Sequence, residues 1–163
     1  MSAHDGGSVL EVGRALPPLE RTIDLVSMVA YSGATWDWHR MHYDRDFVAA
    51  KGFDAPVVDG QVFGALMVEV LQDGLGPRAR VRTLNFRFRS MVYADETVRV
   101  TATRVAGDDS GGASGPLVFD LVVDVVRTPR RNHAANERVA VAGTGTVEIV
   151  EVAEVADAHG APS

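Results

Sequence analysis

The chain has 163 residues, no cysteine, and a net charge of −6 from 16 basic and 22 acidic side chains. This length corresponds to one domain, and the acidic balance disfavours nucleic-acid binding because phosphate contacts need a basic surface. The lack of cysteine excludes disulfide bonds, thiolate zinc sites and a cysteine nucleophile.

No segment of the sequence predicts targeting or membrane insertion. Residues 1–7 are polar without a basic stretch, and no run approaches the roughly 18 apolar residues that a membrane helix needs. We therefore expect a cytoplasmic protein that contacts no membrane and no nucleic acid. Residues 1–18 and 151–163 lack a periodic apolar pattern, so we expect them to be flexible, with one domain over residues 19–150.

The predicted domain opens with a strand and a capped helix. Leu19–Ile23 can form a short strand. Asp24 is a good N-cap because its carboxylate can accept hydrogen bonds from the free N–H groups of a first helical turn. The apolar positions after it predict a helix over Leu25–Ser32, which Gly33 is expected to end.

A segment dense in aromatic and titratable side chains follows this helix. Thr35–Asp44 fits neither the strand period nor the helical period, so we expect a structured loop. Arg45–Ala50 is then predicted to be a short helix closed by Gly52.

The next predicted helix is the most apolar in the sequence. It covers Gly60–Asp73, with Asp59 as its N-cap and with glycines and a proline after it. Its apolar residues occupy nearly all of its sides: Val62, Phe63, Leu66, Met67, Val70 and Leu71. A helix that is apolar all round is buried, so we expect this one at the centre of the fold.

Four segments with alternating apolar residues complete the domain. They are Arg82–Phe88, Thr97–Val105, Leu117–Arg127 and Arg138–Val150. Each predicts a strand with one face for burial. With the first strand they predict an α+β domain in which an antiparallel sheet wraps around a central helix, the arrangement of a single hot-dog fold. Because one sheet covers its helix poorly at the edges, we expect a dimer.

Motifs for serine hydrolysis, phosphate binding and dinucleotide binding are absent from the sequence. His39 and His42 stand three residues apart and can in principle chelate a metal, but without an obvious third ligand we predict no metal site. Asp37 and His42 form a better pair for chemistry. On a helix their side chains would point about 140° apart, so they can act together only from a loop.

The spacing of Asp37 and His42 allows two interpretations. A carboxylate beside an imidazole is a common arrangement for proton transfer, since imidazole exchanges protons near neutral pH. Alternatively, Asp37 caps the turn and His42 packs beneath Trp36 or Trp38, and neither is catalytic. The spacing alone favours the second interpretation.

Three stretches of the sequence resemble the MaoC-like family of (R)-specific enoyl-CoA hydratases and dehydratases. They are Asp37–Asp44, Phe47–Ala50 and Ala55–Gly60, and the similarity extends from about Thr22 to Val105. That family carries an Asp-x(4)-His motif, and its hot-dog helix opens with a Pro-Ile-Val-His-Gly turn. The resemblance implies reversible addition of water to a 2-enoyl thioester, giving the (R)-3-hydroxyacyl product, without a cofactor.

By this resemblance, Asp37 and His42 correspond to the catalytic pair and hold one water molecule. Gly60 corresponds to the glycine whose backbone N–H faces the thioester oxygen of the substrate. A helix N-terminus suits that role because its free N–H groups stabilise a developing enolate. The expected substrate is an acyl-CoA or an acyl-carrier thioester.

The chain departs from the family pattern at three places, and one of them is a spacing from Ser32-Gly33 to Asp37 that is longer than is typical. His39-Arg40 stands where the family has Asn-Pro, and Asp59 replaces the histidine before the helix glycine. We expect His39 and Asp59 to lie near the substrate, and the charge of Asp59 to oppose an enolate unless it is paired or protonated. Further candidates for substrate binding are Val62 and Phe63, for the acyl chain, and Arg130, for the CoA phosphates.

The sequence leaves two other functions open. A hot-dog thioesterase would use a carboxylate base and the same helix N-terminus, but it needs no Asp-x(4)-His pair. The chain can also be one subunit of a heteromeric enoyl-CoA hydratase, as in steroid side-chain degradation. We therefore expect a homodimer or a heterodimer with another hot-dog subunit.

Overall fold

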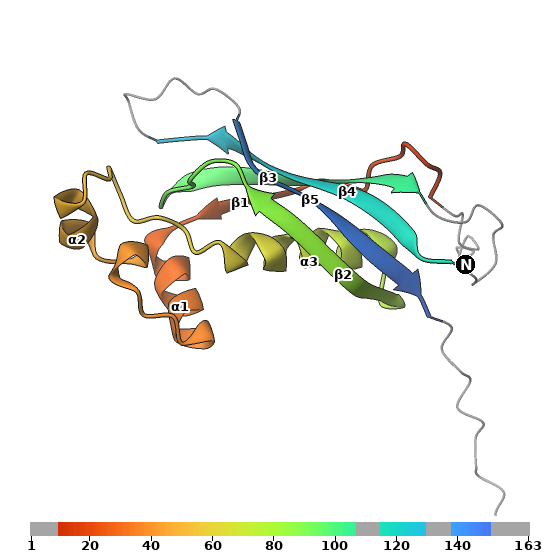
Figure 1. Cartoon of the computed structure of the whole chain (residues 1–163), viewed down its shortest axis with the longest axis horizontal. Helices are drawn as coiled ribbons and strands as arrows, with labels where there is room; N and C mark the ends of the chain where they lie inside the picture. Colours follow the sequence, from red (N-terminus) through yellow and green to blue (C-terminus); the bar gives the residue numbers. More distant parts are fainter. Residues whose placement is uncertain (1–9, 107–114, 130–137, 151–163) are drawn as a thin grey trace, which may run out of the picture.

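The structure of the chain, a computed structural model, describes residues 10–106, 115–129 and 138–150. A sheet lies over one long helix, and shorter helices lie near the end where that helix begins (Figure 1). In chain order the elements are β1 (Leu19–Ile23), α1 (Leu25–Thr35), the 3₁₀ turn η1 (Arg40–His42), α2 (Arg45–Ala50), α3 (Gln61–Leu75), β2 (Ala79–Phe88), β3 (Glu96–Ala106), β4 (Leu117–Arg127) and β5 (Arg138–Ile149).

The strands form one antiparallel sheet in the order β1-β3-β4-β5-β2. Alternation along β4 produces its inner face, because every second residue from Leu117 to Val125 is buried and the residues between them are more exposed. The antiparallel sheet and the central helix that the sequence predicts are therefore confirmed. None of the helices in the described residues is long and apolar enough to cross a bilayer.

The core lies between α3 and the inner face of the sheet. Met67 and Leu71 of α3 are fully buried, and so are Phe119 and Leu121 of β4. Each apolar side chain buried in this way contributes about 1.5–3 kcal/mol to stability. This packing fixes the start of α3 relative to the strands, and the candidate site lies at that point.

One side of α3 is not covered by the sheet. Phe63 is buried, whereas Gln61 and Ala65 are exposed and Val62 and Val68 are partly exposed. The expectation of a helix buried on all sides is therefore wrong for the single chain. A sheet covers only the helix face that it contacts, so the opposite side is open to a partner.

Two glycines have a different role from the one expected. Gly33 lies inside α1, which continues to Thr35, and Trp36 takes the left-handed conformation (φ 62°) that ends the helix. Gly74 also lies inside its helix, and a Cβ there would come within 2.8 Å of the Leu16 side chain, so glycine allows this close packing. Gly76, at φ 84°, follows the actual end of α3.

The described part of the N-terminal segment, residues 10–18, packs against β3. Leu16 is buried at 4% exposure, and its N–H donates to the Ala102 carbonyl oxygen at 2.9 Å. The Arg104 N–H likewise donates to the Arg14 carbonyl oxygen at 2.9 Å. These contacts depart from the expectation of a flexible segment up to residue 18. Residues 1–9 and the predicted tail, 151–163, lie outside the described residues.

Candidate active site

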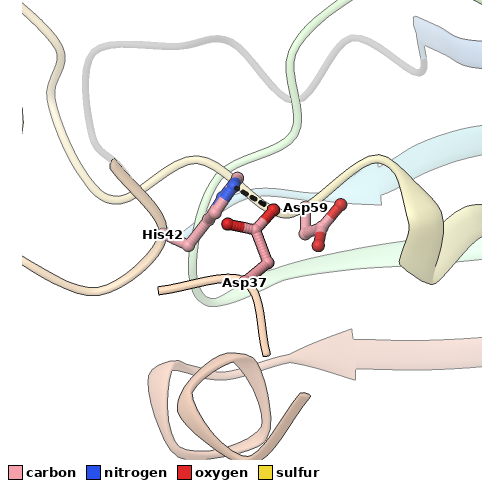
Figure 2. A group of neighbouring side chains, drawn as sticks. All are labelled: Asp37, His42 and Asp59. Carbon is pink, nitrogen blue, oxygen red and sulfur yellow. Dashed lines mark ion pairs between the residues drawn. The ribbon is translucent and has the colours of Figure 1, made fainter. Parts of the chain in front are cut away.

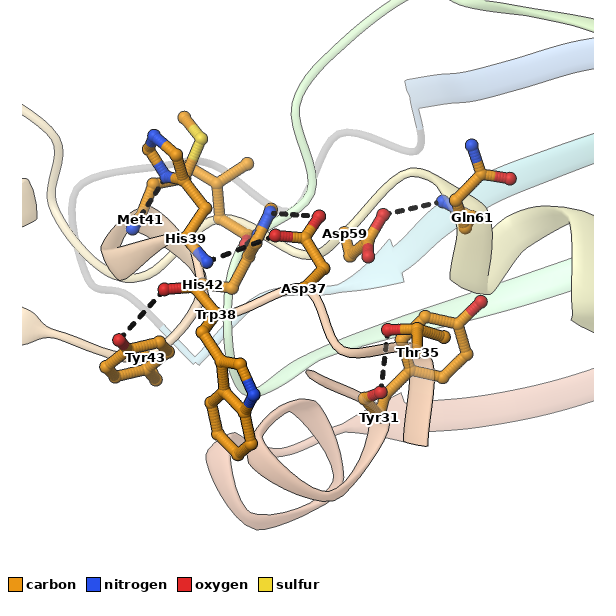
Figure 3. A network of polar contacts seen from close by, with 11 residues as sticks. Tyr31, Thr35, Asp37, Trp38, His39, Met41, His42, Tyr43, Asp59 and Gln61 are labelled. Carbon is orange, nitrogen blue, oxygen red and sulfur yellow. Dashed lines mark hydrogen bonds and ion pairs between the residues drawn. The ribbon is translucent and has the colours of Figure 1, made fainter. Parts of the chain in front are cut away.

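Short-range hydrogen bonds from polar side chains organise the loop between α1 and α2 (Figure 3). After the left-handed turn at Trp36, Asp37 Oδ1 accepts a hydrogen bond from the His39 N–H at 3.1 Å. His39 Nδ1 then accepts one from the Met41 N–H at 3.2 Å and caps η1. The structured loop predicted between the two helices is confirmed, and it contains one 3₁₀ turn.

This loop brings Asp37 and His42 face to face (Figure 2). Asp37 Oδ2 lies 4.0 Å from His42 Nε2, and the exposed fractions of the two side chains are 48% and 12%. One oxygen of Asp37 caps the turn, as the structural interpretation predicts, and the other faces the imidazole, as a catalytic pair would require. The ring beside His42 is that of His39, at a centroid distance of 6.0 Å. Trp36 and Trp38, one of which the structural interpretation places over His42, pack against each other.

A backbone contact determines which nitrogen of His42 carries hydrogen. His42 Nδ1 lies 2.7 Å from the carbonyl oxygen of Val57. A carbonyl oxygen only accepts, so Nδ1 must donate, and in the neutral ring Nε2 is then an acceptor. The 4.0 Å between Nε2 and Asp37 Oδ2 is too long for a direct hydrogen bond, but it suits one bridging water whose two bonds of about 2.8 Å meet at about 90°.

Asp59 places a second carboxylate beside this pair (Figure 2). It is 9% exposed, and its Oδ1 accepts a hydrogen bond from the Gln61 N–H at 2.9 Å. Gly60, at the N-cap position, has no side chain, so Asp59 supplies the cap that the sequence predicts. The pKa of Tyr31 is raised, mainly by burial of its hydroxyl and further by the negative charge of Asp59.

Gly60 stands at the positive end of α3, and the ring of Phe88 lies directly against it. A Cβ at position 60 would lie 2.4 Å from Phe88 Cζ, so this contact requires glycine. The first N–H groups of a helix have no partner within the helix. The start of α3 therefore places backbone donors at the wall of the pocket, beside the Phe88 ring.

A pocket of about 400 Å³ adjoins His42 and Gly60. Its walls are mainly apolar, and Phe88 and Met91 are well exposed, at 58% and 48%. The lining residues are Met41, His42, Val57, Val58, Gly60, Phe63, Phe88, Arg89, Ser90, Met91 and Val92. This shape and polarity suit an acyl chain whose reactive end meets a few polar groups.

The structure brings five of the predicted site residues together. His42, Gly60 and Phe63 line the pocket. Asp37 and Asp59 lie beside His42, with ligand-type atoms of all three residues within 4.8 Å of one another. The sequence motif and the helix N-terminus therefore meet in one place, although 15 residues separate the His42 ring from its Val57 partner in the chain.

Three predicted substrate-binding residues are not in this group. His39 is exposed, caps η1 and packs edge-on against Phe47 at 5.9 Å between centroids. Val62 lies on the partly exposed side of α3 and does not line the pocket. Arg130 lies outside the described residues.

Sequence reasoning missed the wall of the pocket formed by residues 89–92. An ion pair between the partly exposed Arg138 and the buried Glu96 holds this wall. Arg138 Nη2 lies 2.7 Å from Glu96 Oε2 and donates to the Met91 carbonyl oxygen at 3.1 Å. The Val92 carbonyl oxygen accepts from the Val58 N–H at 2.9 Å, which ties the wall to the segment before α3. Apolar alternation in the sequence marks Phe88 as core, and no local signal shows that it faces a pocket.

Comparisons with known proteins identify the family. A family model described as a MaoC-like domain matches residues 10–115. The chain is 30% identical over 98 residues to the 3-oxo-4,17-pregnadiene-20-carboxyl-CoA hydratase beta subunit of Mycobacterium tuberculosis, a match that covers 60% of this chain and 76% of that protein.

Solved structures share the fold. A chain of the ChsH1–ChsH2 complex from Mycobacterium tuberculosis matches with a TM-score of 0.71 and 22% identity, over 87% of this chain and 100% of that chain. The (R)-hydratase from A. caviae involved in PHA biosynthesis matches with a TM-score of 0.71 and 19% identity, over 88% and 100%. These likenesses confirm the predicted hot-dog fold. With the family match over most of its described residues, the chain belongs to the MaoC-like dehydratase family.

Proposed function

We propose that the chain reversibly adds water to the double bond of a 2-enoyl thioester and forms the (R)-3-hydroxyacyl thioester. The observation that carries the proposal is the water-sized gap between Asp37 Oδ2 and His42 Nε2, at the edge of the pocket that also contains Gly60. The named activity of the beta-subunit relative, a CoA-thioester hydratase, supports an acyl-CoA substrate. An acyl-carrier thioester presents the same reacting group.

In this mechanism, Asp37 and His42 accept the two hydrogens of one water molecule. The water oxygen attacks C3 of the enoyl group while one of its protons passes to the pair. The pair then delivers that proton to C2, so that OH and H of one water add across the double bond. Because His42 Nδ1 is tied to the Val57 carbonyl, the ring keeps Nε2 directed at the water. Positioned acid–base groups of this kind contribute about 10²–10⁴-fold to the rate.

Attack at C3 moves negative charge onto the thioester oxygen. The backbone N–H groups at the start of α3 stabilise this charge. The Gly60 N–H stands at the positive end of the helix, and a preorganised donor of this type contributes roughly 3–4 kcal/mol. Asp59 competes for the same positive end, since its carboxylate already accepts the Gln61 N–H. This competition lowers the stabilisation that α3 gives to an enolate.

A second form of the proposal, in which the chain is one subunit of a heteromeric hydratase, is favoured by the uncovered side of α3. The apolar side chains that the sheet leaves partly exposed on α3 would be buried by a partner subunit. The related protein is named a beta subunit, and the similar solved structure is a complex of two proteins. Another hot-dog subunit is therefore as suitable a partner as a second copy of the chain.

Turnover by the purified chain tests the proposal. We expect loss of the conjugated-thioester absorbance with a panel of short, long, branched and steroid 2-enoyl-CoAs, and an (R)-3-hydroxy product by chiral analysis. No turnover by the chain alone or with a co-expressed hot-dog partner would refute hydratase function, and release of free CoA thiol would favour a thioesterase. Activity only with the partner would assign the heteromeric form, whereas a fully active homodimer would exclude it.

A further inference from the structure

Asp37, His42 and Asp59 form a compact donor cluster that hydration alone does not require. The three side chains come from the loop after α1, from η1 and from the residue before Gly60 (Figure 2). One ligand-type atom from each lies within 4.8 Å of the other two. Hydration needs the Asp37–His42 pair, but it gives no role to a buried carboxylate at Asp59.

Each member of the cluster is held by one backbone contact and has another atom available. The His39 N–H donates to one oxygen of Asp37 at 3.1 Å, and the Gln61 N–H donates to one oxygen of Asp59 at 2.9 Å. The His42 ring is oriented by its 2.7 Å contact with a carbonyl oxygen. Outer hydrogen bonds of this kind orient the ligands of metal sites and fix the imidazole tautomer.

The charge and type of these donors favour a divalent cation. Two carboxylates and a neutral imidazole carry a charge of −2, and one of the carboxylates is only 9% exposed. Buried charge is costly unless it is paired or coordinates a metal. A mixed set of nitrogen and oxygen donors suits zinc and its neighbours better than magnesium or calcium, which prefer oxygen alone.

The spacing needs only a small adjustment. Ligand atoms around tetrahedral zinc stand about 3.3 Å apart when the bonds are about 2.0 Å. The corresponding distance between His42 Nε2 and Asp37 Oδ2 is 4.0 Å. Asp37 is about half exposed, at 48%, and it lies on a loop, so its carboxylate can move toward His42. The donor atoms of all three residues lie within 4.8 Å of one another, so each distance between them must shorten by at most about 1.5 Å.

We propose that Asp37, His42 and Asp59 bind a divalent transition-metal ion, with Zn²⁺ as the best match, in the position of the catalytic water. The inhibitory consequence rests on the proposed hydratase function: an ion on Nε2 and Oδ2 removes both acceptors from the water, so metal binding and hydration exclude each other. The cluster is thus a site for metal inhibition of the enzyme, and Asp59 is the residue that creates it.

Zinc binding to the full chain, after removal of metal with a chelator, tests the site without substrate. Calorimetric titration with ZnCl₂ should show one saturable ion per chain, and Asp59→Asn should weaken it by more than about tenfold. Asp73→Asn, which removes an exposed carboxylate at the far end of α3, should leave zinc affinity unchanged. Cobalt should give visible absorption bands of low-symmetry coordination in the parent chain and not in His42→Ala.

Hydration assays then test the inhibitory role. Zinc should inhibit hydration by the parent chain, and a chelator should restore the rate. In Asp59→Asn the zinc concentration for half inhibition should rise more than about tenfold, with inhibition measured against that variant's own zinc-free rate. Absence of saturable zinc binding, or equal binding in Asp59→Asn and His42→Ala, would overturn the site, and zinc stimulation of hydration would overturn its inhibitory role. A chain that binds zinc at these residues but turns over no enoyl thioester would refute the hydratase proposal and leave the metal site established.

Discussion

Replacement of Asp37 by asparagine tests whether Asp37 and His42 hold one water between them. Asparagine keeps the shape of the carboxylate but offers one acceptor and one donor group. The His39 N–H donates to Oδ1 of Asp37 at 3.1 Å, so the amide oxygen of the variant should take that position. Its NH₂ group then faces His42, and the water meets a donor where it had an acceptor.

The expected loss follows from this reversal. Acid–base help of about 10²–10⁴-fold corresponds to about 3–5 kcal/mol of barrier, and kcat of Asp37→Asn should fall by that factor. KM should change little, because Asp37 does not line the pocket in which the acyl chain would bind. His42→Gln should lose a similar factor, since it replaces the basic imidazole nitrogen, the other acceptor of the same water, with an amide that does not take up a proton.

The two losses should not multiply. Groups that act as a unit are strongly non-additive, so the Asp37→Asn/His42→Gln double variant should be close to the slower single variant. Initial hydration rates at saturating substrate measure this, and thermal unfolding of each variant checks that it is folded. Asp73→Asn carries the same charge change on an exposed part of α3 and should keep the parent rate.

Two results would refute the shared-water argument. A double variant whose rate loss equals the product of the two single losses would mean that Asp37 and His42 act independently. A parent-like kcat in Asp37→Asn would mean that the carboxylate at 4.0 Å from His42 only caps its turn. The second result would restore the purely structural interpretation of Asp37.

Three further changes test other parts of the structure. Gly60→Ala puts a Cβ 2.4 Å from Phe88 Cζ, the tip of a ring that is 58% exposed and can turn toward solvent. Urea unfolding should therefore show a loss of less than about 1 kcal/mol, and a loss of several kcal/mol would mean that the ring is fixed in place. Arg138→Met leaves the Glu96 carboxylate, 1% exposed, without its ion-pair partner. The free energy of unfolding should fall by an amount near the lower end of about 3–5 kcal/mol, and Tm should fall with it. An unchanged Tm would contradict the role of the pair. Hydrogen bonds from Ser27 lower the pKa of the Asp24 carboxyl in the folded chain. The ionised carboxylate therefore stabilises the fold above pH 3.8, its pKa in the unfolded chain, and this stabilisation is lost as the pH falls through its lower pKa in the folded chain. Asp24→Asn should therefore show a shallower loss of unfolding free energy below about pH 4 in urea titrations at several pH values, and a slope equal to that of the parent would contradict this assignment.

The strands were predictable because burial on one face leaves a strong period of two in the sequence. The predicted and observed bounds of β4 agree, Leu117–Arg127 in both. β2 starts at Ala79 rather than Arg82, because a shift in its register with β5 between Val81 and Thr83 interrupts the alternation. A bulge of this kind depends on the partner strand, and the sequence of one strand alone does not reveal it.

The candidate site was predictable where its residues are close in the chain. The spacing of Asp37 and His42 and the glycine at the start of α3 were identified from the sequence and meet in the structure. The Val57 carbonyl that orients His42 was not predictable, because backbone acceptors carry no sequence signal. His39 was expected at the substrate, but its ring nitrogen caps η1, a local competition that the loop geometry decides.

The position of the pocket connects substrate binding with the choice of partner. β2 is an edge strand of the sheet, and its last residue, Phe88, is a well-exposed side chain of the pocket. Met91 is exposed in the same pocket, and the uncovered side of α3 carries the partly exposed Val62 and Val68. A subunit that buries Phe88 and Met91 would also reshape the opening through which the acyl chain enters. If the chain pairs with a different hot-dog subunit, substrate selectivity should therefore depend on that subunit as well as on Phe63 and the pocket walls of this chain.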